Sequence, residues 1–113
     1  QDMLREYLSK HGFRVLMLST WDRALTRIKS NPPDGVIVMG DALEEDGPPV
    51  YDEAIRWCEN KGVGCVLVLA SSQRELSQTL KTRATTSVLV QPVQLRAVRT
   101  AVVTTLKAHL NRD

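Results

Sequence analysis

The chain has 113 residues, which is the size of one globular domain and too short for two. Apolar residues make up 42% and charged residues 25%, a composition that excludes a disordered chain. No apolar run approaches the eighteen residues that a membrane-spanning helix needs. We therefore expect a single domain over residues 1–113, with no membrane segment. The sequence shows no signal peptide or lipidation motif, so the expected location is cytoplasmic.

Charge is unevenly distributed along the chain, although the net charge is only +2. Residues 1–73 carry eight Lys or Arg against eleven Asp or Glu, whereas residues 74–113 carry seven against two. This basic part is either a solvated surface or an interaction surface for an acidic partner. No aromatic residue lies among its basic residues, which argues against a platform for single-stranded nucleic acid, and we do not expect a nucleic-acid partner.

Apolar periodicity predicts alternating helices and strands. The predicted helices are 2–11, 20–31, 49–61, 71–86 and 93–113. The predicted strands are 13–19, 36–40, 65–70 and 87–92. The apolar helix positions expected to face the core are Ala24, Leu25, Ile28, Tyr51, Ile55, Cys58, Leu76, Leu80, Leu95, Val98, Val102, Leu106 and Leu110. Because strands 36–40 and 65–70 are apolar throughout, both faces of their sheet should be covered. The prediction is an α/β domain with a doubly wound parallel sheet and right-handed crossovers.

The chain offers little for nucleotide or metal chemistry. None of the loops that follow the strands contains a glycine-rich phosphate-binding motif, which disfavours a nucleotide enzyme. Cys58 and Cys65 lack metal-ligand spacing, and Cys65 lies inside an apolar run, so both are expected to be free core thiols. The acidic run 44–46 is expected to be solvated rather than to bind a metal. We expect no cofactor and no Mg²⁺ site.

Four phrases, in this order, resemble the receiver domain of response regulators, the phosphorelay module of two-component signalling. They are "LREYLSKHGFRVLMLSTWDRAL", "NPPDGVIVM", "CVLVLAS" and "RATTSVLVQPVQLRAV", and together they cover nearly the whole chain. The resemblance implies a flavodoxin-like fold with strand order 2-1-3-4-5 and a site at the carboxyl ends of the strands.

The resemblance places unsuitable residues at the positions that carry receiver activity. Met39 stands at the position of the phosphorylated aspartate, Ala70 at that of the Thr or Ser hydroxyl, and Gln91 at that of the lysine. Val88 replaces the aromatic switch residue, and Pro92 follows Gln91 where the family has a Lys-Pro bond that is typically cis. The thioether of methionine has no carboxylate to accept a phosphoryl group, and it is a poor ligand for Mg²⁺, which prefers oxygen. The sequence therefore predicts a degenerate site with no catalytic residue.

The first strand of a receiver, which occupies the centre of its sheet, is missing from this sequence. The chain begins inside what would be the helix that follows that strand. Without a central strand, the two strands that flank it should lack ladder partners. We expect residues upstream of Gln1, or a strand from a neighbouring chain, to complete the sheet.

These features favour a pseudo-receiver: a regulatory or protein-interaction module that is independent of phosphorylation and is not an enzyme. Its partner would be another protein, another domain of the same polypeptide, or a second copy bound through the last two helices. The expected interaction surface carries Arg74, Lys81, Arg83, Arg96 and Arg99. These side chains would pair with acidic groups.

Two alternatives remain open. In the first, the chain is a working receiver phosphorylated on Asp41, with Ser71 supplying the hydroxyl. In the second, it is a small α/β enzyme or ligand-binding domain whose cleft contains Asp41, Ser71, Ser72 and Gln91. No base is paired with a nucleophile in this set, and the histidines, His11 and His109, are expected to be solvated at helix ends.

Overall fold

The computed structural model describes residues 10, 12–18, 21–40, 48–80 and 85–110. Its strands are β1 (Val15–Leu18), β2 (Gly35–Met39), β3 (Gly64–Leu69) and β4 (Thr86–Val90). Its helices are α2 (Trp21–Ser30), α3 (Pro48–Lys61), the 3₁₀ helix η2 (Ser71–Gln73), α4 (Leu76–Thr79) and α5 (Leu95–Leu110). The predicted alternation of strands and helices is confirmed for these residues, apart from the segment after β3. The predicted helix over 2–11 lies outside them, except for Lys10.

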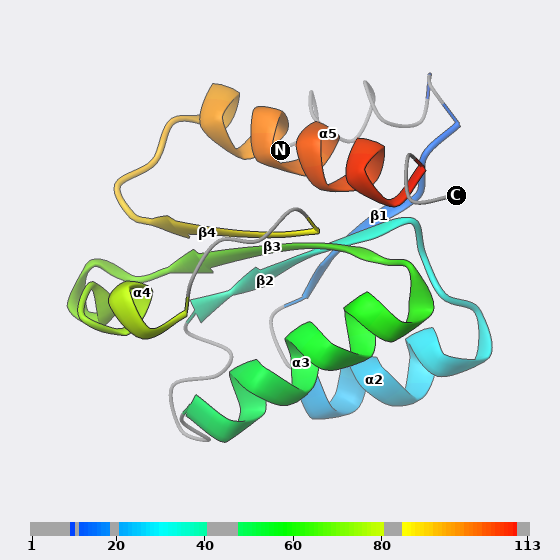
Figure 1. Ribbon diagram of the computed structural model, residues 1–113, viewed down its shortest axis with the longest axis horizontal. Coiled ribbons are helices and arrows are strands. Elements are labelled where there is room, and N and C mark those ends of the chain that lie inside the picture. Colours follow the sequence, from blue (N-terminus) through cyan, green and yellow to red (C-terminus); the bar gives the residue numbers. More distant parts are fainter. Residues whose placement is uncertain (1–9, 11, 19–20, 41–47, 81–84, 111–113) are drawn as a thin grey trace.

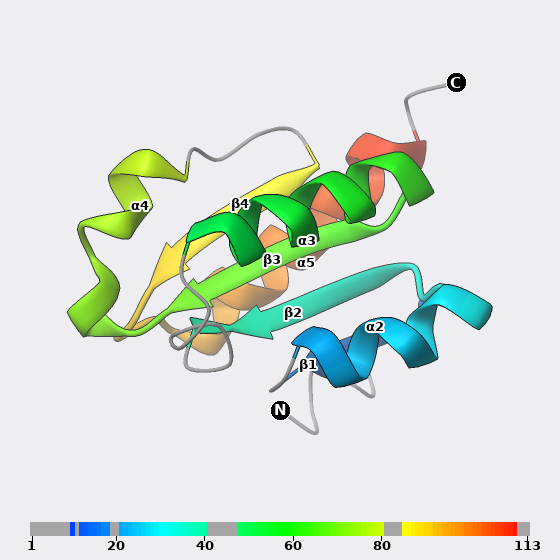
Figure 2. The same ribbon diagram turned by 90° about the horizontal axis from the view of Figure 1, so that it is seen from below.

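The four strands form one parallel sheet in the order β1-β2-β3-β4. Each crossover moves one strand along in the same direction, and right-handed crossovers then place their helices on one face. Figures 1 and 2 show α2, α3 and α4 on that face and α5 on the other. The prediction of a parallel sheet covered by helices on both faces is therefore confirmed.

Strands β1 and β2 pair directly with each other, from Val15 opposite Gly35 to Leu18 opposite Val38. The expectation that these two strands would lack ladder partners is wrong, because each supplies the other's backbone hydrogen bonds. Asp34 fixes the start of this pairing: its Oδ2 accepts the Arg14 backbone N–H at 2.7 Å, and its own N–H donates to the Arg14 carbonyl at 2.8 Å.

A hydrophobic cluster lies on each face of the sheet. Alternation along β2 sends Val36 and Val38 to the face with α2, α3 and α4, and Ile37 and Met39 to the α5 face. The buried members on the first face are Leu18, Ile28, Val36, Val38, Tyr51, Ala54, Ile55, Cys58, Val63, Cys65, Leu67, Leu69 and Leu80. On the α5 face they are Ile37, Val66, Val68, Ala101, Val102 and Leu106.

Two predictions about helices are wrong. The continuous helix over 71–86 is replaced by η2, a turn and the short α4, which ends where Leu80 becomes extended (φ −90°, ψ 94°). Ser77 Oγ donates to the Arg74 carbonyl at 2.5 Å, a local bond of the kind that competes with regular helix. Leu95, expected in the core, is 43% exposed. It is the first residue of α5, and the helix packs against the sheet only from Val98 onward.

Candidate functional site

The site predicted from the sequence lies where β2 and β3 end, and we call this region the carboxyl edge. Its described residues include Met39 and Ala70, which the sequence singled out, and Gly40, Tyr51 and Gln73, which the structure places beside them. Open α/β sheets bind their ligands at this edge, outside the carboxyl ends of the strands. In this structure the edge is occupied by the protein's own side chains.

Met39, the last residue of β2, is half-buried and packs against the cluster beneath α5. It pairs with Val68 across the β2–β3 ladder. Its thioether therefore contributes to the core at the position that the receiver resemblance assigns to the phosphorylated aspartate. A thioether supplies neither a nucleophilic oxygen nor a hard ligand for Mg²⁺.

A hydrogen-bonded network joins β2, α3 and the turn after β3. The Gln73 side chain is its centre: Oε1 accepts the Ala70 backbone N–H at 2.9 Å, and Nε2 donates to the Gly40 carbonyl at 3.2 Å and to the Tyr51 hydroxyl at 3.0 Å. The Tyr51 hydroxyl in turn donates to the Gly40 carbonyl at 3.2 Å. Tyr51 is 1% exposed and Gln73 is half-buried, so most of this network is shielded from water.

Gly40 is required for the close packing of this network. A Cβ at residue 40 would overlap Gln73 Oε1 and would lie 2.9 Å from Leu69 Cα and 3.0 Å from the Ala70 nitrogen. Two of these three atoms belong to the backbone, at the last residue of β3 and the residue after it, and cannot move away as a flexible side chain could. Glycine thus allows the ends of β2 and β3 to approach while the carboxamide lies between them.

The sequence did not identify Gln73 and Tyr51 as site residues. Tyr51 was expected in the core, which is confirmed, but its hydroxyl had no predicted partner. Gln73 was placed in a regular helix, where its side chain would be one polar group among several. Its contact with Gly40 spans 33 positions of sequence, and no local pattern predicts such a contact.

The remaining positions taken from the resemblance lie on β4 and just after it. Val88 is half-buried and packs on the face with α2, α3 and α4. Gln91 is half-buried, and its backbone N–H donates to the Leu69 carbonyl at 2.9 Å. The Gln91-Pro92 peptide bond is cis, as expected from the resemblance.

The residues of the two alternative sites are not gathered into a described cleft. Asp41 and the acidic run 44–46 lie outside the described residues. Ser71 and Ser72 are exposed in η2. Thus the described part of the chain supplies Gln73, rather than a serine hydroxyl, to the interior of the carboxyl edge.

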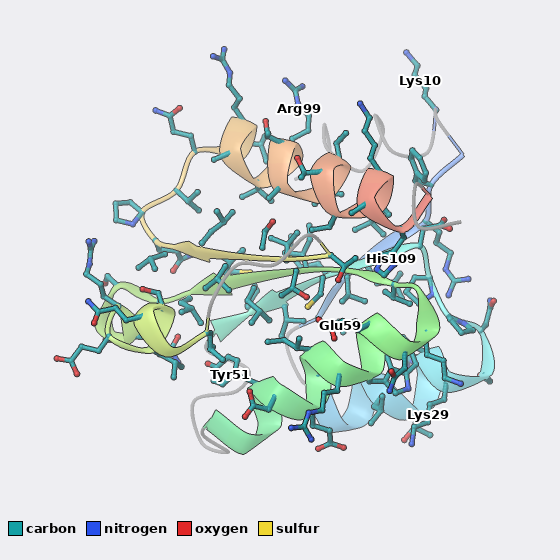
Figure 3. All side chains as sticks on the ribbon, in the orientation of Figure 1. Lys10, Lys29, Tyr51, Glu59, Arg99 and His109 are labelled. Carbon is teal, nitrogen blue, oxygen red and sulfur yellow. The ribbon has the colours of Figure 1, made fainter. Side chains whose placement is uncertain are left out.

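Three of the five expected interaction residues are described. Arg74, Arg96 and Arg99 are exposed, whereas Lys81 and Arg83 lie outside the described residues. Arg74 lies in the turn after η2, and the other two lie on α5 with the exposed Lys107. The α5 sequence contains no Asp or Glu. Figure 3 shows Arg99 pointing away from the sheet and Lys29 of α2 on the opposite side of the molecule.

The two cysteines are free, buried and adjacent, as expected for core thiols. The pKa of the Cys65 thiol is raised well above that of a free cysteine, first by its hydrogen bond with the Cys58 thiol and then by burial. A raised pKa suppresses the thiolate, which is the reactive form.

The amino end of the sheet, where β4 begins and α5 finishes, holds buried polar atoms of a different kind. Thr86 Oγ1 and His109 Nε2 are buried and have no hydrogen-bond partner among the described residues. The expectation that His109 is solvated is wrong, because the last turn of α5 still packs on the molecule and leaves this residue half-buried. Figure 3 shows His109 far from Tyr51 at the carboxyl edge.

Within the described residues, no three His, Cys, Asp or Glu side chains are grouped closely enough to hold a metal ion. None of the helices in this part of the chain has the length and apolar character needed to cross a membrane. Comparison with models of protein families, with curated proteins and with solved structures found no match for this chain.

Proposed function

We propose that this chain is a receiver-like regulatory module that binds an acidic protein partner through α5 and is not controlled by phosphorylation. The proposal has three parts: the receiver relationship, the inactive site and the binding surface. Each part is supported by a different observation.

The relationship to receivers is supported by the order of the four phrases and by the arrangement of the elements. Removing the first strand from the receiver order 2-1-3-4-5 leaves four strands in sequential order, which is the order β1-β2-β3-β4. The helices also divide between the faces with the last helix opposite the three that precede it (Figure 2). Direct pairing of β1 with β2 is the feature that departs from a complete receiver sheet.

The observation that carries the proposal is the composition of the carboxyl edge. At the three positions that would handle a phosphoryl group, the chain has Met39, Ala70 and Gln91. These side chains supply no carboxylate, no hydroxyl and no positive charge. Because Met39 packs in the core and the Gln73 carboxamide lies across the edge, a regulatory role that uses these three positions would act without aspartyl phosphate.

The binding surface is supported by the charge of α5. Its buried side, which includes Ala101, Val102 and Leu106, packs on the sheet. Its outer side carries Arg96, Arg99 and Lys107, all exposed. Guanidinium groups form paired, charge-assisted hydrogen bonds with carboxylates, so the chemistry of this face fits an acidic protein segment.

A charge-reversal experiment tests the surface. The variant Arg96→Glu/Arg99→Glu would be compared with Arg27→Glu/Lys29→Glu, which makes the same charge change at exposed positions of α2. Fluorescence anisotropy would measure binding of a labelled, glutamate-rich peptide to the full-length protein. We expect the α5 variant to bind at least about tenfold more weakly, equivalent to about 1.4 kcal/mol, and the α2 variant to bind like the wild type.

Equal losses in the two variants would show a general charge effect and contradict the assignment to α5. Binding of a labelled DNA duplex, which is also negatively charged, would be measured in the same way. Tighter binding of the duplex than of the peptide would overturn the proposal of a protein partner. Sedimentation velocity on the same samples tests whether a second copy of the chain uses this face.

A further inference from the structure

We propose that Gln73 is an internal ligand that locks the carboxyl edge, and that the socket it fills is selective for a primary carboxamide. Opening of this edge to any ligand would then require the Gln73 side chain to swing out. This inference rests on the geometry of the network and does not depend on the proposed partner of α5.

The socket matches a primary carboxamide group by group. Such a group has one carbonyl oxygen and two N–H donors. The oxygen, Oε1, faces the Ala70 backbone N–H, and the two donors face the Gly40 carbonyl and the Tyr51 hydroxyl. The reverse orientation of the carboxamide would place its N–H₂ group against the Ala70 N–H, donor against donor.

A carboxylate would not satisfy the same socket. Its two oxygens accept hydrogen bonds when ionised, and the Gly40 carbonyl is also an acceptor. A protonated carboxylic acid would again supply a donor to that carbonyl. The socket therefore distinguishes a carboxamide from a carboxylate by charge and by donor count.

The position of Gln73 suits a lock rather than a fixed core contact. The residue lies in a three-residue 3₁₀ helix whose neighbours Ser71, Ser72 and Arg74 are exposed. Such segments, with few buried contacts, open at lower free energy than core strands do. Displacing the side chain would remove the side-chain partner of the Ala70 N–H, at the edge where α/β sheets bind ligands. It would also remove one partner each from the Gly40 carbonyl and the Tyr51 hydroxyl, which remain bonded to each other.

Amide hydrogen exchange followed by NMR tests the lock. The variant Gln73→Ala is expected to raise the exchange rate of the Ala70 amide at least tenfold while the amides of central β3 residues keep their protection. Gln78→Ala, the same substitution at an exposed glutamine of α4, is expected to change neither. Unchanged Ala70 exchange in Gln73→Ala, or an equal loss of protection throughout β3, would overturn the proposal.

Gln73→Glu provides a second variant of nearly the same shape. Ala70 should be protected at acidic pH, where the new side chain is protonated and can donate to the Gly40 carbonyl. Protection should fall as the pH rises through the pKa of the carboxyl group, which is about 4.3 in a free glutamate. Protection that does not vary with pH in this variant, relative to the wild type, would contradict the donor requirement.

Acetamide tests the selectivity of the socket, because it carries the atoms that Gln73→Ala removes. We expect added acetamide to slow Ala70 exchange in Gln73→Ala and to leave the wild type unchanged. Acetate at the same concentration should have no such effect. An equal effect of acetate and acetamide, or no effect of either, would overturn the assignment of a carboxamide ligand.

Discussion

Both ends of the sheet bury polar side chains, but those named at the carboxyl edge are hydrogen-bonded, whereas two buried polar atoms at the amino end have no partner among the described residues. At the carboxyl edge, the Tyr51 hydroxyl and the Gln73 carboxamide are bonded to each other and to the Gly40 carbonyl. At the amino end, Thr86 Oγ1 and His109 Nε2 have no partner among the described residues. A buried polar group stabilises a fold where it is paired and costs free energy where it is not. Removing the Tyr51 hydroxyl and removing the Thr86 hydroxyl should therefore have opposite effects on stability.

The difference also separates positioning from packing. At the carboxyl edge, hydrogen bonds between polar groups hold the end of β2, α3 and η2 in fixed positions relative to one another, as a defined site requires. The amino end is held mainly by apolar side chains around Cys58, Cys65 and Leu106 and by backbone ladders.

The largest effect is expected from Gly40→Ala at the carboxyl edge. The new methyl group would displace the Gln73 carboxamide and press on the backbone at Leu69 and Ala70, so we expect a loss of about 3 kcal/mol in the free energy of unfolding. Urea denaturation followed by circular dichroism would measure it. Gly35→Ala is the matched control, because its Cβ would meet its nearest neighbours at 3.3–3.4 Å. A cost at residue 40 no greater than that at residue 35 would contradict the tight packing described for this edge.

Removing the hydroxyl of Tyr51 is the next largest change. Tyr51→Phe deletes a donor to the Gly40 carbonyl and an acceptor for Gln73 Nε2 inside a buried network. We expect it to destabilise the fold by about 2 kcal/mol, measured by the same denaturation assay. A neutral or stabilising result would mean that the network contributes nothing at this end.

At the amino end, Cys65 predicts a dependence of stability on alkaline pH. Its pKa is raised in the folded state by the hydrogen bond with Cys58 and by burial, so the folded protein retains the proton while the unfolded chain releases it above about pH 8.5. Each pH unit above that value should lower the free energy of unfolding by up to about 1.4 kcal/mol. Measurements between pH 8 and 9.5 should show a shallower slope in Cys65→Ala. An identical slope in the two proteins would rule out this thiol as the source.

The smallest expected effect, and the one of opposite sign, is that of Thr86→Val. This change removes an unpaired hydroxyl from a fully buried position and keeps a branched side chain that suits a strand. We expect it to stabilise the fold by about 1 kcal/mol. Paired with Tyr51→Phe, it tests the comparison itself: two hydroxyl deletions that destabilise equally would show that the two ends do not differ.

The sequence predicted most of the fold because the signals for it are local. The predicted strands 36–40 and 65–70 differ from β2 and β3 by only one residue at each end. They were easy to locate because uninterrupted apolar runs between turn residues are typical of buried strands. The segment 71–86 was mispredicted because spaced leucines suggested a helix, whereas Gln73 and Ser77 bond to nearby and distant backbone instead. The exposure of Leu95 and the burial of His109 depend on where α5 meets the sheet, which periodicity alone does not specify.

The site was predictable only in part, for a similar reason. The sequence placed Met39 and Ala70 at the ends of apolar strands, and the structure puts them at or just after the ends of β2 and β3. Their receiver roles, like that of Gln91, stay a prediction from the resemblance. The network of Gly40, Tyr51 and Gln73 could not be predicted, because it is created when β2, α3 and η2 meet in space. Direct pairing of β1 with β2 was missed because the receiver resemblance places another strand between them, although consecutive strands are usually neighbours.

The measurement that tests the central claim most directly is the intact mass of the folded protein after incubation with acetyl phosphate and Mg²⁺, beside Asp41→Asn. A cooperative thermal transition before incubation would establish that both samples are folded. A module that works without aspartyl phosphate should gain no phosphoryl group in either protein. A phosphoryl adduct on the wild type that is absent from Asp41→Asn would contradict the account, because it would show that Asp41 serves as the phosphoacceptor in place of Met39.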